Sequence, residues 1–326
     1  MRKLLSITLA AIACHAGGAA LAQGTAAANW PERPVTIIVP FAPGGGTDII
    51  GRLVATQLTQ ALGKPFLIDN RGGAGGNLGT GQAVRAVPDG YTLLMHSSAY
   101  FVNPSLYKSV PYNAEKDFVP ITELASAPNI FVAHPKANIK SLPDLVVQAR
   151  KNPGKFNFAS AGVGVSTHLD GELLNLREKI DLVHIPYGGA GPAIAAVLAG
   201  TPEIGAFFMP PLQPHLKAGT LKPLAITSEK RWYNMPDVPT MVELGYPDFI
   251  SETVIVFFAP AGTPPDIVRK VEAATIRALQ TPEVKLKTEE MGYAILGRGA
   301  AALSARTQRE LVFYKKLITD AKIPVQ

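Results

Sequence analysis

Four glycine-rich loops carry the residue types best suited to chemistry on a small anion. They span residues 43–48, 72–77, 160–168 and 187–191. Glycine lets the backbone approach a ligand closely and adopt a positive φ. The hydroxyls of Thr47, Ser166 and Thr167 can cap a helix or donate a hydrogen bond to a carboxylate. The loops therefore predict recognition of an anion by backbone N–H and hydroxyl groups.

Each loop falls between a predicted strand and a predicted helix. Helical patterns alternate with short β-rich runs at residues 35–39, 65–68, 92–95, 130–133, 156–159, 182–185, 223–226 and 254–259. This alternation is typical of an α/β fold with largely parallel sheets. In such sheets ligands bind outside the carboxyl ends of the strands, and a helix N-terminus offers unpaired N–H groups to an anion. We expect the four loops to line one crevice.

Any single loop of this kind is more often only a tight connection, with its hydroxyl serving as a helix cap. Recurrence in four loops favours a binding site. Asp48 is expected to cap its helix or hold its loop, because a carboxylate repels an anionic ligand at short range. Arg71 is the one cation among the glycines, and the sequence leaves open whether it pairs with Asp69 or faces the ligand.

Known catalytic and nucleotide-binding motifs are absent. No loop continues into the Lys-Ser/Thr of a P-loop or fits G-x-G-x-x-G, and G-x-S-x-G is missing. The histidines after residue 23 lack metal-ligand spacing. We therefore predict a protein that is not an enzyme and uses no metal or cofactor. The alternative is a secreted hydrolase or lyase, motivated by His168 beside Ser166 and near Asp170, and a third possibility is an envelope protein with a vestigial cleft.

Composition indicates a folded protein of two domains. With 47% hydrophobic and 17% charged residues the chain is globular, and about 300 residues after a leader is long for one core. No run of four basic residues exists, which argues against nucleic-acid binding. We place a signal peptide at 1–22, one lobe at 23–124 plus 233–326, and a second lobe at 125–232.

The amino terminus predicts export. Arg2 and Lys3 precede an apolar stretch at residues 4–13, and small residues lead to Ala22, so the segment reads as a secretory signal peptide cleaved before Gln23. The stretch is shorter than the roughly 20 residues of a membrane-spanning helix. Cys14 follows a poor lipobox, so we expect simple cleavage without a lipid anchor. The mature chain then lacks cysteine and is expected to be a periplasmic monomer.

With these loops identified, the mature chain resembles the receptors of tripartite tricarboxylate transporters, the Bug or TctC-like family of periplasmic solute-binding proteins. The resemblance rests on an ordered set of short motifs, each weak alone and highly specific together. They lie at residues 30–34, 39–52, 69–77, 88–94, 103–107, 116–118, 168–173, 186–187, 236–240 and 259–264.

The resemblance implies a two-lobed fold of type II-like periplasmic binding proteins, in which each lobe is a mostly parallel sheet flanked by helices. A ligand carboxylate is expected in the cleft, held by backbone groups and ordered waters. Carried over residue by residue, the implied site comprises Phe41, Gly44, Gly45, Gly46 and Thr47 on one lobe, Ser160, Gly162, Ser166 and Thr167 on the other, and Ser97, Ser98, Tyr187 and Gly189 as further contacts.

The implied function is capture of a small carboxylate, which is a dicarboxylate, tricarboxylate, aromatic acid or amino acid, for membrane transporter subunits or a sensor partner. Two departures from the family pattern limit which family properties the resemblance implies for this chain. Glu203 stands where the family usually has Asp, and Val254 stands where a Trp is common. Residues 207–209 (Phe-Phe-Met) favour an apolar ligand body, but strand packing explains them equally well. The sequence leaves open which carboxylate is bound and whether Arg71, His168 or Glu203 contacts it.

Overall fold

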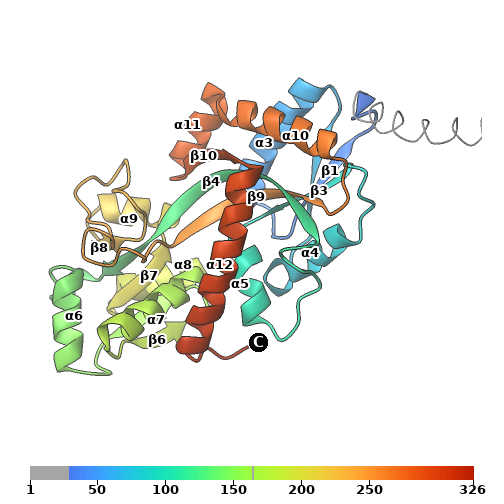
Figure 1. Cartoon of the computed structure of the whole chain (residues 1–326). Coiled ribbons are helices and arrows are strands. Elements are labelled where there is room, and N and C mark those ends of the chain that lie inside the picture. The colour runs from blue at the N-terminus through green and yellow to red at the C-terminus, as the bar shows by residue number, and fades with distance from the viewer. Residues whose placement is uncertain (1–28, 164) are drawn as a thin grey trace, which may run out of the picture.

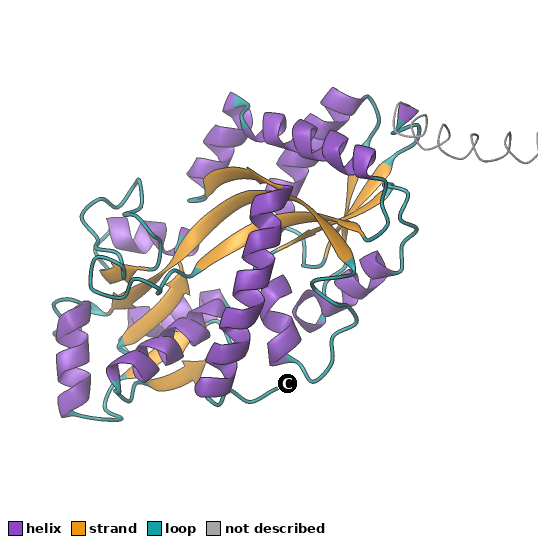
Figure 2. Cartoon of the chain, in the orientation of Figure 1, coloured by secondary structure: helices purple, strands orange, loops and turns teal. Residues whose placement is uncertain are grey.

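The structure is a computed structural model that describes residues 29–163 and 165–326. The predicted signal peptide lies outside the described residues. Ten strands of the described part form one continuous sheet, ordered β2-β1-β3-β9-β4-β7-β5-β6, with β10 and β8 also pairing with β4 (Figures 1 and 2). Helices cover both sides of this sheet, which confirms the predicted α/β class.

The first half of the sheet is built from three parallel strands. They are β1 (Val35–Val39), β2 (Phe66–Asn70) and β3 (Thr92–His96). Each leads into a helix, namely α3 (Gly46–Leu62), α4 (Asn77–Val84, after the short η1 at Ala74–Gly76) and α5 (Ala99–Leu106). The predicted apolar stripe of α3 packs on the sheet, with Ile50, Val54 and Leu58 fully buried. The carboxyl ends of these strands therefore meet at one edge.

The second half repeats this arrangement. Its parallel strands are β5 (Asn157–Ser160), β6 (Val183–Pro186) and β7 (Ile204–Phe208), followed by α7 (Ser166–Glu178), α8 (Ala190–Ala199), and η3 (Pro210–Leu212) with α9 (Gln213–Lys217). Around them lie η2 (Pro135–Ala137), α6 (Leu142–Lys151) and the antiparallel β8 (Lys222–Ile226).

One long strand, β4 (Phe118–Ala133), belongs to both halves. Its residues 118–128 pair with β9 (Glu252–Pro260), and Asn129 onward pairs with β7 and β8. The sequence predicted only residues 130–133 as strand, because prolines at 120 and 128 and polar residues between them obscure the β pattern. The ladder accommodates Pro120 beside a register shift. The lobe boundaries near 125 and 232 stay a prediction.

The C-terminal part confirms the helices expected after Pro264. They are α10 (Pro265–Leu279), α11 (Pro282–Glu290) and α12 (Ala300–Asp320). An additional strand, β10 (Ala294–Gly299), pairs antiparallel with β4 and was not predicted, because its side chains are mostly half-buried and show no alternation. Figure 1 shows α12 crossing in front of β4 and β9, and α12 contacts α5 and α7. This helix therefore packs against both halves.

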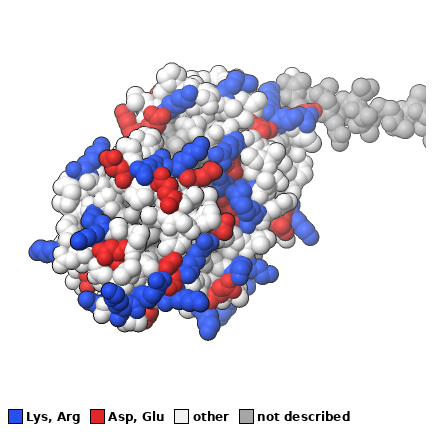
Figure 3. Space-filling model, turned by 60° about the vertical axis from the view of Figure 1, so that its left-hand side comes forward, with Lys and Arg blue, Asp and Glu red and all other residues white. Residues whose placement is uncertain are grey.

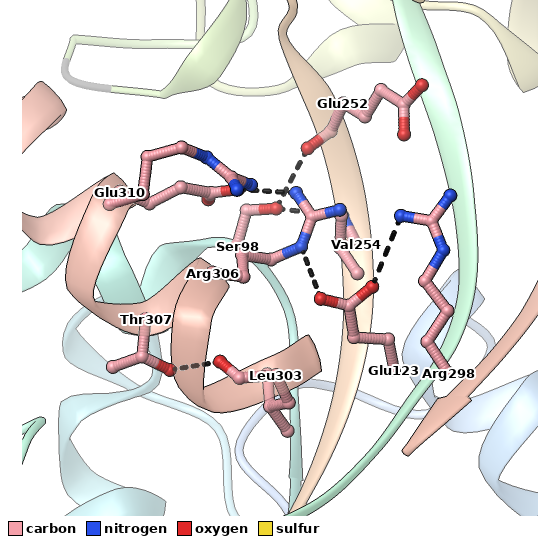
Figure 4. A network of polar contacts seen from close by, with 10 residues as sticks. Ser98, Glu123, Glu252, Val254, Arg298, Leu303, Arg306, Thr307 and Glu310 are labelled. Carbon is pink, nitrogen blue, oxygen red and sulfur yellow. Dashed lines mark hydrogen bonds and ion pairs between the residues drawn. The ribbon is translucent and has the colours of Figure 1, made fainter. Parts of the chain in front are cut away.

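A buried ion-pair network fixes α12 on the crossing strand β4 (Figure 4). Arg306 Nε donates to Glu123 Oε1 at 2.7 Å, and Arg306 also pairs with Glu310 one turn later. Glu123 is 1% exposed, and Arg298 from β10 lies 3.8 Å from its second oxygen. Burial alone opposes the charged guanidinium, but the two carboxylates outweigh it and raise the pKa of Arg306. The buried charges of this network therefore balance one another only while all of its members are present.

Replacing Arg306 by Ala is expected to lower the free energy of unfolding by about 3–5 kcal/mol, because Glu123 is left buried without its partner. Urea denaturation measures this change. Arg309→Ala is the control, since Arg309 is exposed and lies 3.8 Å from Glu310, a long ion-pair distance. Its substitution is expected to change the free energy of unfolding by less than about 1 kcal/mol. Equal effects of the two substitutions would contradict the assigned role of Arg306.

Candidate functional site

A cavity of about 300 Å³ lies between the two halves of the sheet. It opens at the carboxyl ends of β1, β2, β3 and β5, where the sequence predicted a crevice. Its lining comprises Phe41, Gly75, Ser97, Ser98, Ala99, Val102, Asn103, Leu106, Tyr107, Val163, Val165, Ser166 and Thr253. The second and third glycine-rich loops therefore contribute to one partly open cavity, and Phe41 just before the first loop joins them.

Two serine hydroxyls from opposite halves line this cavity. Ser166 begins α7, and its Oγ accepts a hydrogen bond from Asn129 Nδ2 at 3.1 Å. Ser97 follows β3, and its Oγ accepts from the Ala99 N–H at 3.3 Å. A hydroxyl that accepts in this way still carries its own proton for donation. The cavity thus offers one O–H donor from each side to an acceptor-only group such as a carboxylate.

Several helices begin at this edge of the sheet without a side-chain cap. The N-cap residues of α3, α7 and α8 are Gly45, Val165 and Gly189, and none caps its helix with a side chain. Uncapped starts also occur away from this edge, at α10, α11 and α12, whereas α6 is capped by Ser141, which accepts from the Asp144 N–H at 3.3 Å. Uncapped first turns leave N–H groups and the positive end of the helix dipole available to an anion.

The first glycine-rich loop is held by Asp48. Its Oδ2 accepts from Gly44 N at 2.9 Å and from Arg52, and its Oδ1 accepts from Asn70 Nδ2 at 3.0 Å. Burial raises the pKa of Asp48, but the bonds from Arg52, Gly44 and Asn70 outweigh burial and lower it. The prediction that Asp48 holds its loop is confirmed. Arg71 pairs with Asp69 at 2.9 Å and is half-exposed, outside the cavity lining.

Gly46 and Gly45 differ sharply in the space around them. A Cβ at Gly46 would overlap the hydroxyl of Tyr293, whereas a Cβ at Gly45 would meet only the Ala42 carbonyl at 3.7 Å. Tyr293 lies just before β10, and its ring packs edge-on against Phe208 at 5.4 Å between centroids. Because Phe208 ends β7, Tyr293 joins the start of α3 to the second half of the sheet, and glycine is required at 46.

The third and fourth loops are bonded to each other. Ser160 is fully buried, and its Oγ lies 2.7 Å from His184 Nε2 and donates to the Gly162 carbonyl at 2.9 Å. The Tyr187 N–H donates to the Ser160 carbonyl at 3.1 Å. His184 stacks on His168 with centroids 3.9 Å apart, and burial lowers the pKa of His184 to about 4. Ser160 therefore braces the loops, and its hydroxyl is already engaged.

The structure places the predicted site residues in two groups. Phe41, Ser97, Ser98 and Ser166 line the cavity together. The others do not line it, namely Gly44, Gly45, Gly46, Thr47, Ser160, Gly162, Thr167, Tyr187 and Gly189. Thr167 is nonetheless buried in the first turn of α7, and its Oγ1 has no hydrogen-bond partner among the described residues. The full ligand-contacting set stays a prediction.

Sequence reasoning missed the face of α5 that forms one wall. Ala99, Val102, Asn103 and Leu106 line the cavity at the i, i+3, i+4, i+7 spacing of one helix face. That spacing, starting directly after the Ser97-Ser98 pair, was the available signal. Val163 and Val165 were also missed, because hydrophobic side chains in a glycine-rich loop gave no periodic pattern.

Two groups of the hydrolase alternative share one partner, and the third contacts a different residue. Ser166 and Asp170 both accept from Asn129 Nδ2, at 3.1 and 2.7 Å, while His168 Nε2 lies 3.6 Å from Glu172. Asp170 is 3% exposed, and burial raises its pKa to about 7 despite the bonds from Ser251 and Asn129. The three side chains therefore do not form a nucleophile–base–acid relay.

Two structural searches of the described residues bear on cofactors and membranes. No group of three or more His, Cys, Asp and Glu side chains there is placed to hold a metal ion. None of the described helices is long and apolar enough to cross a membrane. On the face that Figure 3 shows, Lys and Arg alternate with Asp and Glu instead of gathering in one basic patch.

Comparison with known proteins places this geometry in a family. Residues 50–320 match the tripartite tricarboxylate transporter family receptors (TctC). The protein BugT of Bordetella pertussis is 39% identical over 278 residues, which cover 85% of each chain. The structure of R. palustris Rpa4515 with adipate is 29% identical, covers 90% of this chain and 99% of that one, and has a TM-score of 0.77.

A further solved structure, MatC from Rhodopseudomonas palustris with bound malate, is 32% identical and has a TM-score of 0.74. It covers 89% of this chain and 100% of that one. The fold and the cleft define a two-lobed periplasmic solute-binding protein. This chain belongs to the tripartite tricarboxylate transporter receptor family, which includes the Bug proteins. The predicted family is confirmed, and its members are binding receptors of the periplasm and not enzymes.

The raised pKa of Asp170 predicts a pH-dependent stability. Between the ordinary value of 3.8 and about 7, the folded protein keeps a proton that the unfolded chain has lost. The free energy of unfolding therefore falls as pH rises through this window. Asp170→Asn should remove the fall and stabilise the protein above pH 7 by about 4 kcal/mol, since each pKa unit of the shift from 3.8 to about 7 is worth about 1.4 kcal/mol.

Urea denaturation at several pH values tests this expectation. Asp248→Asn is the matched control, because the Asp248 side chain is 83% exposed, and it should leave the pH dependence unchanged. A native protein whose stability rises from pH 4 to 7 in parallel with the Asp170→Asn variant would show that Asp170 is ionised in the fold.

Proposed function

We propose that this chain captures a small carboxylate in its inter-lobe cavity, with the carboxylate held between Ser97 on one lobe and Ser166 on the other. The observation that carries the proposal is the pair of hydroxyls that line one cavity from opposite lobes with their protons free to donate. A carboxylate has only acceptor sites, so it satisfies both donors at once.

Neutral donors suit a receptor that must also release its ligand. A hydrogen bond from a hydroxyl to an ionised carboxylate contributes about 1.5–3 kcal/mol, and the positive end of α7 adds a smaller favourable term. Because the two hydroxyls belong to different lobes, the bound carboxylate favours a closed arrangement of the lobes. The malate and adipate named with MatC and Rpa4515 support an organic acid as the ligand class.

The partners and the location are further parts of the proposal. We infer that the chain is exported, is cleaved near Ala22 and Gln23, and works as a monomer in the periplasm. It delivers its ligand to the membrane subunits of a tripartite tricarboxylate transporter, with a sensor ectodomain as the alternative partner. Membership of the receptor family supports the first partner.

Thermal-shift screening tests the ligand class. At about 100 times its Kd, a carboxylate ligand is expected to add about 2.7 kcal/mol to the free energy of unfolding. Mono-, di- and tricarboxylates are compared with their amides and with neutral sugars. Stabilisation by sugars or amides in preference to the acids would contradict the proposed function.

Substitution of the two serines tests the site. Ser97→Ala and Ser166→Ala should each weaken binding by about 1.5–3 kcal/mol, because each removes a donor to an ionised group. Isothermal titration calorimetry measures the affinity, and unfolding without ligand measures any loss of stability in the variants.

Two control variants separate binding from folding. Ser141→Ala removes the cap of α6 and should cost about 0.5–2 kcal/mol of stability with unchanged affinity. Arg71→Ala removes an exposed ion pair and should leave affinity unchanged. If Arg71→Ala abolishes binding while both serine variants bind normally, the site is wrongly assigned.

A further inference from the structure

The cavity is lined without a charged side chain. None of its lining residues, all of which the structure describes, is Asp, Glu, Lys, Arg or His. Arg71, the cation of the second loop, is engaged with Asp69 outside it. One carboxylate can be held by the serine hydroxyls and the start of α7, but no cation faces a second one.

Polarity changes along the length of the cavity. Ser97 and Ser98 stand at the start of α5, and Leu106 and Tyr107 stand at its end, about 12 Å away at 1.5 Å per residue. The backbone of Gln326 bonds Leu106, and its side chain contacts the Val163 carbonyl, so Val163 lies at the same end as Leu106. The far end from the serines is therefore walled by Leu106, Tyr107 and Val163.

The side chains of Ser98 and Asn103 are already engaged in hydrogen bonds. Asn103 Nδ2 donates to the Gly75 carbonyl at 2.9 Å and to Asn77 Oδ1 at 3.0 Å. Ser98 Oγ donates to the Glu252 carbonyl at 3.0 Å and accepts from Val254 N at 2.8 Å. Thr253 also lines the cavity with a hydroxyl, and it stands between Glu252 and Val254, the partners of Ser98. At the far end, Tyr107 is the one lining residue of the described chain whose side chain carries a donor, and one neutral donor does not balance an ionised carboxylate.

The free energies of burial at the apolar end favour one kind of ligand body. A second carboxylate packed against Leu106 and Tyr107 gives up part of its hydration without a partner charge, whereas each buried methylene contributes about 0.8 kcal/mol. The volume of about 300 Å³ equals roughly ten water molecules at about 30 Å³ each. It therefore suits a ligand of about ten non-hydrogen atoms.

We propose that the ligand is a monocarboxylate with an apolar aliphatic or aromatic body that extends along α5, in contrast to the dicarboxylates named with the relatives. The proposal rests on the proposed function, in which Ser97 and Ser166 hold the one carboxylate. Val102, Leu106, Val163 and Val165 select the body.

Calorimetric titration of the mature protein at neutral pH tests this selection. Octanoate and adipate have the same number of non-hydrogen atoms and differ in the second carboxylate, phenylacetate supplies an aromatic body, and octanamide lacks the charge. Octanoate or phenylacetate is expected to bind at least about tenfold more tightly than adipate and than octanamide.

The second part of the test is a substitution designed to change the preference between octanoate and adipate. Val163→Lys places a cation at the apolar end, on a side chain that is 37% exposed, and should raise the affinity for adipate about tenfold relative to octanoate. Val163→Met keeps the length without the charge and should preserve the native preference. Val312→Lys adds the same charge at a 70% exposed position outside the cavity and should change nothing.

Each outcome decides between the two proposals. Tighter binding of adipate than of octanoate and phenylacetate by the native protein overturns the monocarboxylate inference and leaves the carboxylate receptor standing. Equal binding of octanamide and octanoate overturns the proposed function itself. Failure of every acid to bind a protein whose circular dichroism shows it folded overturns both, and an unchanged preference in Val163→Lys overturns the placement of the ligand body along α5.

Discussion

The structure depends on one buried polar junction where the chain passes between lobes. Asn129 lies on β4, Thr227 follows β8 and Ser251 precedes β9, and backbone and hydroxyl bonds join all three. The Asn129 amide also reaches Ser166 and Asp170 on α7. Because polar groups without partners are costly in such a site, these bonds fix the crossing strands, and they orient the hydroxyl that lines the cavity.

This junction explains how an uncharged cavity can be specific. Ser166, which lines the cavity, accepts a hydrogen bond from Asn129 without any ligand present, and a hydroxyl that is held in place in advance lowers the entropy cost of binding. The same buried surroundings raise the pKa of Asp170, which is a local cost in stability. Elsewhere the Arg306 and Glu123 pair joins α12 to β4, and this helix also contacts α5 and α7.

The sequence predicted the helices, strands and loops more accurately than the tertiary contacts between them. The bounds of β1 match the prediction, because its five residues are all β-branched and stand between two prolines, which clearly indicates a strand. The length of β4 was missed, since its prolines and its buried Glu123 are tolerated only through tertiary partners such as Arg306, far away in sequence. The glycine-rich loops were located correctly, but the opposing contact of Tyr293 at Gly46 has no local signal. The burial of Ser160 has no local signal either, because its hydroxyl is engaged by a histidine from a different strand.

The two departures from the family pattern act at different distances from the cavity. Glu203 precedes β7, where its backbone carbonyl accepts from His134 N at 2.8 Å. It is thus about 16 Å of strand away from the Phe208 end that faces the first loop. Val254 is fully buried in β9 and donates its N–H to Ser98 Oγ at 2.8 Å. Of residues 207–209, only Phe208 is partly exposed, and it meets Tyr293. Glu203 therefore lies far from the cavity lining, whereas Val254 holds a residue of that lining, Ser98, at the start of α5.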